Sequence, residues 1–480
     1  AGAALGAFLL AAGLKLAARR RLGQVLLGGA IATFYTTIFA AFQFYALLSS
    51  PLAVVAMSSV TLLAFALAIG QDDGVLGVVA VLGGLATPFV LYTDEGSVPG
   101  LVVYTSLVVA SAAAIYLRNG WRTLLWASAA GGWLVMLVAW VQVVFQDADT
   151  WSDEAALLAG AGICWLAFGG VPTVRTLLHH AAPDRWPVPP TRFTGVFFLE
   201  RPALLLAAVA PLATLFLAYE VMEEGLPDVV IGLLILAAAG GYAAACAALR
   251  RRGLPALGSA HAVAAALLAA FSIPEFVDNV SVQLLLLAAE ALAVHAAAQR
   301  LPDRALRATG HALTGVVVVA FIARLGAGGE LPVLLNGRAL ADLTVLALLA
   351  GSAFTLRQGG VPRRAYLLAV YLGLLGWFWR DLEALDNGQA FVSLAWGVTA
   401  LLLLAAGWYR DADGLRTVGL VTLGFVVAKL FVIDLAKLDA VWRILLFLGL
   451  GGLILLLSYL FPRLWRPSQT PTPVPAAEEG

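Results

Sequence analysis

The segment from Gly419 to Phe461 constrains the fold of this chain more than any other. It consists of two long apolar runs joined by a short charged hinge, KLFVIDLAKLDAVWR. A run of about 20 apolar residues has the length that a helix needs to cross the hydrocarbon core of a bilayer. Because backbone groups in lipid must satisfy their own hydrogen bonds, two such runs with so short a connection predict a transmembrane helical hairpin.

Charged side chains stand at fixed places in that hinge: Lys429, Asp434, Lys437, Asp439 and Arg443. Lys429 lies inside the first run, where a bare ammonium group costs on the order of 3 kcal/mol. Two interpretations are open: its side chain extends to the nearby membrane surface, or it pairs with Asp434 or with a carboxylate of another helix. Asp439 and Arg443 are four residues apart, so they can pair across one helical turn and position the hairpin.

The composition of the whole chain also predicts an integral membrane protein. It is 61% hydrophobic and 12% charged, with a mean hydropathy of +0.92, whereas soluble domains carry about twice that share of charge. Motifs for nucleotide phosphates, serine or zinc hydrolysis and paired cysteines are missing from the sequence, which disfavours ATP-driven pumping and familiar hydrolase chemistry. We expect no cofactor, metal or nucleic-acid partner, and we expect the lipid bilayer to surround the chain.

Apolar runs separated by charged or Pro/Gly clusters predict an all-α polytopic bundle of about 17 transmembrane helices in antiparallel hairpins. The predicted spans are 1–18, 23–48, 51–70, 74–93, 98–117, 123–145, 155–173, 202–220, 229–249, 255–273, 281–299, 306–325, 339–356, 364–380, 389–409, 415–435 and 441–461. We expect residues 1–466 to form a single transmembrane bundle. Residues 467–480 are rich in Pro and Thr and are expected to be a disordered cytosolic tail.

The charges of the loops predict the orientation. If residues 19–21 lie in the cytosol, alternation of sides leaves six of the 29 Lys and Arg residues outside the cytosolic loops: Arg324, Arg338, Arg380, Lys429, Lys437 and Arg443. The outer loops are acidic, the longest cytosolic segment is 174–201, and WFWRDLE at 377–383 marks the outer interface. Since Lys and Arg favour the cytosolic side, we predict a multi-pass protein of the cytoplasmic membrane with a cytosolic C-terminus.

Three motifs resemble one known family. They are KLFVIDLAKLDAVWRILLFLGLG preceded by LRTVGL, GGLATPF at 83–89, and LLGGAIATFYTTIFAAFQFYALL near the N-terminus. Together they resemble a large prokaryotic family called domain of unknown function 2339, at both ends of the chain. The resemblance implies a membrane protein of many helices and brings no biochemical role. Since members of that family usually carry further helices, and often a cytosolic coiled segment, before this region, we expect the chain to begin partway through a longer protein.

Glu290 is the best single candidate for a functional residue. It stands in the middle of VQLLLLAAEALAVHAAAQR, roughly 13 Å deep at 1.5 Å per residue, which is too far for a short acid to reach water. Acids inside membranes often mark proton or ion paths, but a protonated glutamic acid that only packs is an equally good interpretation. His295 and Lys429 are the available partners for its carboxyl group.

Further candidates lie in the first hundred residues. Tyr35 and Gln43, on an aromatic and hydroxylated helix, can line a groove for a polar headgroup, although we favour hydrogen bonds between helices. Pro88 breaks a helix, either for packing or to line a binding cavity. Asp94 and Glu95 in an outer loop resemble the acid pairs of many-helix glycosyltransferases that use lipid-linked sugars, but a solvated loop is the simpler interpretation.

Three functions are compatible with these features. The leading hypothesis is transport or flipping of a small polar or lipid-linked solute, which can be coupled to protons. The second is an enzyme that acts on a lipid-linked substrate at the outer face through Asp94 and Glu95, and the third is a structural scaffold for other envelope proteins. A polar cavity at mid-membrane favours transport, a pocket that opens outward beside Asp94 favours the enzyme, and the scaffold needs neither.

Overall fold

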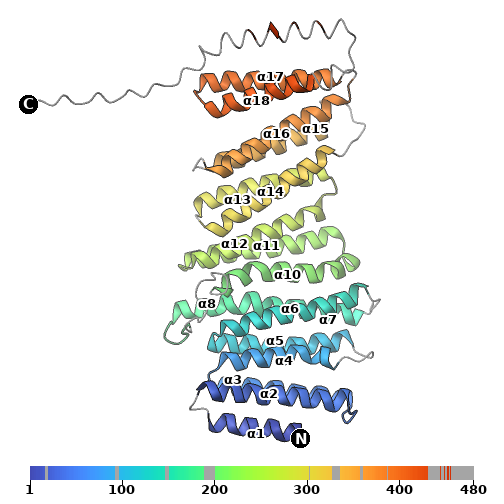
Figure 1. The fold of residues 1–480 in the computed structure, drawn as a ribbon, viewed down its shortest axis with the longest axis vertical. Coiled ribbons are helices and arrows are strands. Elements are labelled where there is room, and N and C mark those ends of the chain that lie inside the picture. The colour runs from blue at the N-terminus through green and yellow to red at the C-terminus, as the bar shows by residue number, and fades with distance from the viewer. Residues whose placement is uncertain are drawn as a thin grey trace, which may run out of the picture. The chain divides into compact units, whose positions relative to one another are not determined.

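The computed structural model is all-helical over the residues that it describes (Figure 1). These are residues 1–16, 20–91, 97–145, 151–188, 201–301, 303–326, 336–356, 360–385 and 388–430, with the single positions 444, 448, 451, 452 and 455. They form two compact units. Unit 1 comprises Ala1–Val319 and Ala347–Tyr366, and unit 2 comprises Ala320–Leu346 and the chain from Leu367 onward.

The helices follow one another with short connections. Their bounds are α1 (Gly2–Lys15), α2 (Arg20–Gln43), α3 (Ser50–Gly70), α4 (Gly74–Val90), α5 (Val98–Asn119), α6 (Arg122–Phe145), α7 (Trp151–Trp165), η1 (Leu166–Gly170), α8 (Val171–Ala181), α10 (Pro202–Gly225), α11 (Asp228–Arg251), α12 (Pro255–Phe276), α13 (Val280–Arg300), α14 (Arg304–Gly326), α15 (Gly337–Thr355), α16 (Val361–Glu383), α17 (Gly388–Tyr409) and α18 (Asp413–Lys429). Each of α14, α15 and α16 contributes residues to both units.

Twelve spans among the described residues are long and apolar enough to cross a membrane, and α1 and α4 are shorter apolar helices. A hydrocarbon core of about 30 Å requires about 20 apolar residues in a helix, which explains why hydropathy alone locates these elements. The prediction of an all-helical protein with many membrane-length segments is therefore confirmed. The last predicted span, 441–461, lies largely outside the described residues, so the count near seventeen stays a prediction.

One predicted boundary is wrong. The sequence pattern predicts the end of a span at residue 173 and a loop from residue 174, but the helix runs without interruption from Trp151 to Ala181 through α7, η1 and α8. Pro172 lacks an N–H group and would break a regular helix at this point. The π-helical turn of η1 comes just before it, with the Val171 N–H bonded to the Leu166 carbonyl. This wider turn lets the helix continue past the proline.

Unit 1 is held together by close packing of apolar side chains. Helices adjacent in sequence pack in pairs, for example α1 with α2, α3 with α4, α5 with α6 and α11 with α12, and α4 also packs on α6 and α5 on α7. In the largest core, the fully buried Phe168 meets Trp133 edge to face at 5.2 Å. Helices α11 and α12 are rich in Ala and Gly, and small residues let membrane helices approach closely. A methyl group added to Gly258 would lie 3.1 Å from the Cys246 carbonyl oxygen.

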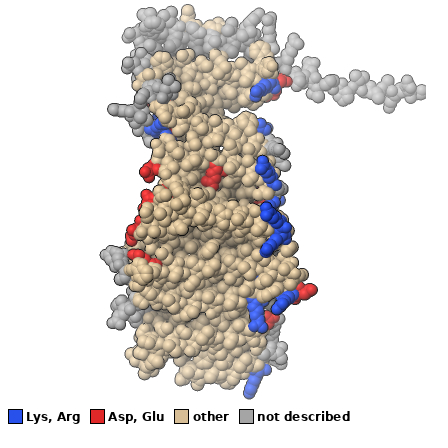
Figure 2. Space-filling model, turned by 180° about the vertical axis from the view of Figure 1, so that it is seen from behind, with Lys and Arg blue, Asp and Glu red and all other residues tan. Residues whose placement is uncertain are grey.

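Charges are separated across unit 1. Figure 2 shows Lys and Arg side chains along one edge of this unit, with a few acidic side chains beside them, and further Asp and Glu side chains along the opposite edge. Arg250 and Arg251 end α11 and Arg252 lies in the connection to α12, whereas the connection between α12 and α13 carries Asp278. Lys and Arg residues are enriched in the cytosolic loops of membrane proteins, and this asymmetry is the basis for predicting their orientation.

Candidate functional site

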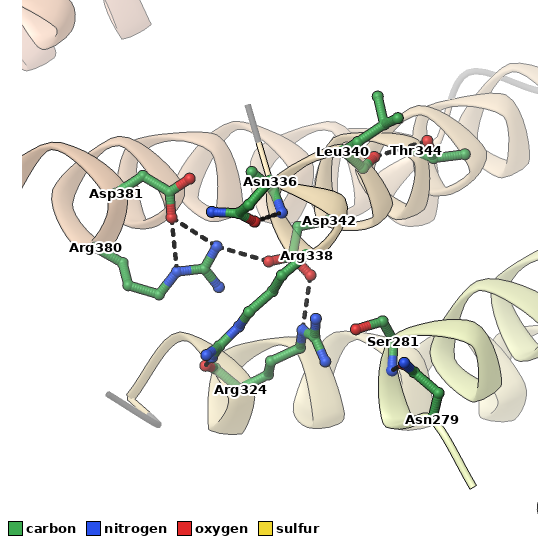
Figure 3. Close-up of polar contacts among 11 residues, drawn as sticks. Asn279, Ser281, Arg324, Asn336, Arg338, Leu340, Asp342, Thr344, Arg380 and Asp381 are labelled. Atoms are coloured by element: carbon green, nitrogen blue, oxygen red, sulfur yellow. Dashed lines mark hydrogen bonds and ion pairs between the residues drawn. The ribbon is translucent and has the colours of Figure 1, made fainter. Parts of the chain in front are cut away.

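The C-terminal end of α16 carries charged side chains into buried surroundings in unit 2. Trp377 is 4% exposed and Asp381 9%, and the Arg380 side chain is 12% exposed. The charged neighbours of this segment come from the last turns of α14 and the first turns of α15 (Figure 3). A buried guanidinium or carboxylate requires a partner of opposite charge, because its desolvation is costly.

Asp342 on α15 joins these elements. Its Oδ1 atom accepts a hydrogen bond from Arg324 Nε at 2.8 Å, and its Oδ2 atom forms an ion pair with Arg380 Nη2 at 2.7 Å (Figure 3). Arg380 also donates from Nε and Nη2 to Asp381 Oδ1, at 2.9 and 2.8 Å. Arg338 Nη2 donates to the Arg324 carbonyl oxygen at 2.9 Å. We call Arg324, Arg338, Asp342, Arg380 and Asp381 the α16 cluster.

The ends of the helices explain part of this arrangement. Asn336 precedes α15, and its side-chain oxygen accepts a hydrogen bond from the Ala339 N–H at 2.7 Å, which caps the helix. Arg338 lies in the first turn of α15, where the helix dipole disfavours a cation. Its guanidinium reaches instead the Arg324 carbonyl in the last turns of α14, where carbonyl groups lack helical partners and the dipole favours positive charge.

The α16 cluster combines three guanidinium groups with two carboxylates. Arg380 Nη1, Asp381 Oδ2 and Trp377 Nε1 are buried atoms that have no hydrogen-bond partner among the described residues. Buried donors are rarely left unsatisfied unless water or a ligand completes them. Because guanidinium groups bind carboxylate and phosphate oxygens with charge-assisted hydrogen bonds, the cluster has the chemistry of an anion site.

Lys429 forms a second buried cationic site in unit 2. It is 6% exposed. Its ammonium group donates to the Gln389 carbonyl at 2.9 Å and to Ser393 Oγ at 2.7 Å, both on α17. The ammonium also lies 5.8 Å from the ring centroid of Trp379 on α16, a cation–π distance. Lys429 therefore links α18 to α17 and α16.

Glu290 on α13 lies in unit 1. Both of its carboxyl oxygens are buried, and neither has a hydrogen-bond partner among the described residues. The two partners expected from the sequence bind elsewhere: Lys429 bonds to α17, and His295 joins a separate group of polar residues. An isolated ionised carboxylate costs far more in apolar surroundings than a neutral carboxylic acid, so we expect Glu290 to carry a proton.

His295 belongs to a polar group between α13, α14 and α16. It is 1% exposed, and its Nε2 atom lies 3.1 Å from Thr314 Oγ1 and 3.4 Å from the Tyr366 hydroxyl. The Tyr366 hydroxyl also bonds to His311 Nδ1, and the two imidazole rings meet at 5.1 Å between centroids. We call His295, His311, Thr314 and Tyr366 the His295 group. Among the described residues, no three His, Cys, Asp or Glu side chains come together as metal ligands.

Tyr35 makes contacts between helices. Its hydroxyl lies 2.7 Å from Thr61 Oγ1 on α3. Its ring covers Gly83 on α4, where an added methyl group would lie 2.4 Å from the ring. Pro88 lies inside α4, which ends two residues later at Val90, and Gln43 is exposed at the end of α2. The Tyr35 contacts are those of helix packing.

Five candidate residues lie outside the described part of the chain. They are Asp94, Glu95, Asp434, Asp439 and Arg443. The ion pair expected within the closing hairpin and the acid pair expected in the outer loop therefore stay predictions.

Comparison with known protein families bears on the identity of the chain. The model of a family described as "predicted membrane protein (DUF2339)" matches residues 1–383 and 312–464. The chain belongs to this family. Membership in DUF2339 confirms the resemblance seen in the three sequence motifs, and the family description names no activity. No curated protein and no solved structure matches the chain, so the site geometry has to support any functional assignment.

The sequence alone did not predict that the residues of the α16 cluster lie together, although the positions of its arginines were unusual. Arg324, Arg338 and Arg380 are three of the six basic residues that alternation of sides places outside the cytosolic loops, and the structure brings these three together. Basic residues outside the cytosolic loops are exceptions to the charge asymmetry of membrane proteins, so an interaction within the protein is expected to explain their position. His311 and Tyr366, in the His295 group, carried no such signal.

Proposed function

We propose that this DUF2339 protein transports or flips a solute that bears an anionic group, either small or lipid-linked, and that the α16 cluster binds this group. The observation that supports the proposal most directly is the buried Arg380 Nη1 atom, which has no partner among the described residues. It lies beside two carboxylates that already share the rest of the Arg380 guanidinium. An incoming carboxylate or phosphate oxygen would satisfy this donor.

A purely structural role explains the cluster less well. Replacing a buried ion-pair network by apolar residues of similar volume is often neutral or stabilising. A membrane bundle therefore gains little stability from burying three arginines together. A binding role explains why the cluster has more guanidinium groups than carboxylates, because the excess positive charge attracts an anion into apolar surroundings.

The proposal includes the finer topology. We infer about 17 transmembrane helices in antiparallel hairpins, arranged as one bundle in the cytoplasmic membrane of a prokaryote, with the C-terminus in the cytosol and the α16 cluster toward the outer face. The charge separation of unit 1 supports this orientation. Single cysteines at positions 150 and 180, with the buried Cys164 and Cys246 replaced by serine, test it in intact cells. A membrane-impermeant thiol reagent should label position 150 and spare position 180, and the reverse pattern would contradict the topology.

Flux measurements on reconstituted protein test the proposed transport. One set of proteoliposomes receives radiolabelled phosphate, succinate or glutamate, and a second contains fluorescent phosphatidylglycerol whose transfer between leaflets is followed by dithionite quenching. We expect flux above that of empty vesicles in at least one set. Arg380→Gln should abolish this flux, and Arg380→Lys should retain part of it, because lysine keeps the charge and loses the bidentate geometry.

Controls separate loss of binding from loss of folding. Arg410→Gln changes an arginine between α17 and α18 that is exposed, and it should leave flux unchanged. Melting curves of each purified variant show whether it is folded. Flux in neither set of vesicles, from protein that melts cooperatively, would contradict transport and favour the scaffold hypothesis. The outer-face enzyme depends on Asp94 and Glu95, and no contact of the described residues favours it.

A further inference from the structure

A cavity of about 290 Å³ lies in unit 1, beside the first turns of α6, α10 and α12. Its lining includes four basic side chains, Arg122, Arg175, His179 and Arg201, and no acidic side chain from the part of the chain that the structure describes. The rest of the lining is largely apolar and includes Tyr116, Val188, Leu204, Leu254 and Leu257. The cavity therefore combines positive charge with apolar walls.

Arg175 lies in the lining of the cavity and is held in place by hydrogen bonds to backbone carbonyls. It is 6% exposed. Its Nη1 atom donates to the Leu117 carbonyl and, at 3.2 Å, to the Arg118 carbonyl, and its Nη2 atom donates to the Pro187 carbonyl at 2.9 Å. It thus caps the C-terminal carbonyls of α5. Gly120, which ends α5 with φ of +74°, is required here, because a methyl group on it would overlap the guanidinium.

Three helices begin at the cavity. Arg122 is the first residue of α6, Pro202 of α10 and Pro255 of α12, and all three residues belong to the lining. Neither α10 nor α12 has a side-chain cap. The first N–H groups of a helix lack helical acceptors, and the dipole adds partial positive charge at this end. Together with the Arg122 and Arg201 side chains, these helix ends make the cavity strongly attractive to an anion with several oxygens.

We propose that this cavity binds a phosphate group, separately from the α16 cluster and independently of transport. Guanidinium groups and helix N-termini both match the geometry and charge of phosphate oxygens. The phosphate comes either from a lipid, whose chains would contact the apolar walls, or from free phosphate. The two sources share one site chemistry, and the experiment distinguishes them.

Binding is measured by thermophoresis on the full chain in detergent. The probes are dioctanoyl phosphatidic acid, dioctanoylglycerol as its phosphate-free counterpart, and inorganic phosphate as a competitor. Phosphatidic acid should bind at least about tenfold more tightly than dioctanoylglycerol, since a charge-assisted contact is worth a factor of this size. If millimolar inorganic phosphate competes with phosphatidic acid, free phosphate is a sufficient ligand. If inorganic phosphate does not compete, the lipid is the source of the phosphate group.

Two variants locate the site, and a third serves as a control. Arg122→Gln removes one charge, and Ala256→Trp fills the cavity from an exposed position. Each should weaken phosphatidic acid binding by at least about tenfold. Arg300→Gln alters an exposed arginine that is not in the lining, so it should bind as the wild type does. Wild-type affinity in both Arg122→Gln and Ala256→Trp would overturn the proposal, as would equal affinity for phosphatidic acid and dioctanoylglycerol.

Discussion

Asp342 in unit 2 and Glu290 in unit 1 are both acids on membrane-length helices, and their surroundings differ sharply. The Asp342 side chain is 1% exposed and contacts two guanidinium groups at 2.8 and 2.7 Å. Both carboxyl oxygens of Glu290 are also buried, but they have no partner among the described residues. One acid is paired with two cations, and the other has no such partner among the described residues.

The difference shows two ways to place a carboxyl group in an apolar interior. At Asp342 two arginines offset the charge of the carboxylate. At Glu290, whose carboxyl oxygens have no partner among the described residues, we expect a proton to remove the charge instead. Replacing each acid by its amide therefore removes a charge at Asp342 and removes only a titratable proton at Glu290. The same chemical change should have very different consequences at the two positions.

Asp342→Asn should produce the largest loss of stability. The amide leaves Arg324 and Arg380 without the carboxylate that joins them, and breaking a buried ion pair from one side costs about 3–5 kcal/mol. Unfolding of the purified variant in a denaturant series measures the change. Asp411→Asn is the matched control, because Asp411 pairs with Arg416 while 93% exposed, and its effect should be close to zero. Similar losses in the two variants would refute the ion-pair interpretation of the α16 cluster.

Lys429→Met should have an intermediate effect. Methionine keeps much of the apolar stem and removes the ammonium group that binds the Gln389 carbonyl and Ser393 Oγ. Leaving buried polar groups without their partner costs about 1–3 kcal/mol. A double-mutant cycle with Ser393→Ala isolates the shared contact, and we expect coupling of more than about 0.5 kcal/mol between the two positions. Strict additivity would show that the observed contact contributes nothing to stability.

The positions of the helices could be predicted from the sequence, whereas the polar sites mostly could not. Hydropathy is a local property, so runs of apolar residues located the described helices. The α16 cluster depends on contacts between residues far apart in the chain: Asp342 lies 18 residues from Arg324 along the chain and on a different helix. The charge asymmetry singled out its arginines as exceptions but could not show that they meet.

Glu290 itself was identified from the sequence, but its surroundings were not. His295 is five residues further along α13, which places it about 140° around the helix at 3.6 residues per turn. The two side chains therefore point in different directions, and His295 meets α14 and α16 instead. Similarly, the partners of Lys429 are 36 and 40 residues earlier in the chain, a separation at which sequence spacing carries no information about contact.

Glu290→Gln should produce the smallest change in stability at neutral pH. Glutamine has nearly the shape of a protonated glutamic acid and also donates a hydrogen bond, so a change below about 1 kcal/mol is expected. The difference should appear as pH rises. If the folded state holds the Glu290 proton more tightly than the unfolded state, the folded state binds more protons, and wild-type stability must fall with increasing pH.

Unfolding measured at several pH values tests this directly, because the amide has no proton to lose. Wild type and Glu290→Gln should be equally stable in acid, and the variant should become the more stable of the two in alkali. Wild-type stability that rises with pH relative to Glu290→Gln would mean that Glu290 is ionised and has a cationic partner. In that case the contrast with Asp342 would disappear, and both acids would belong to ion-pair sites.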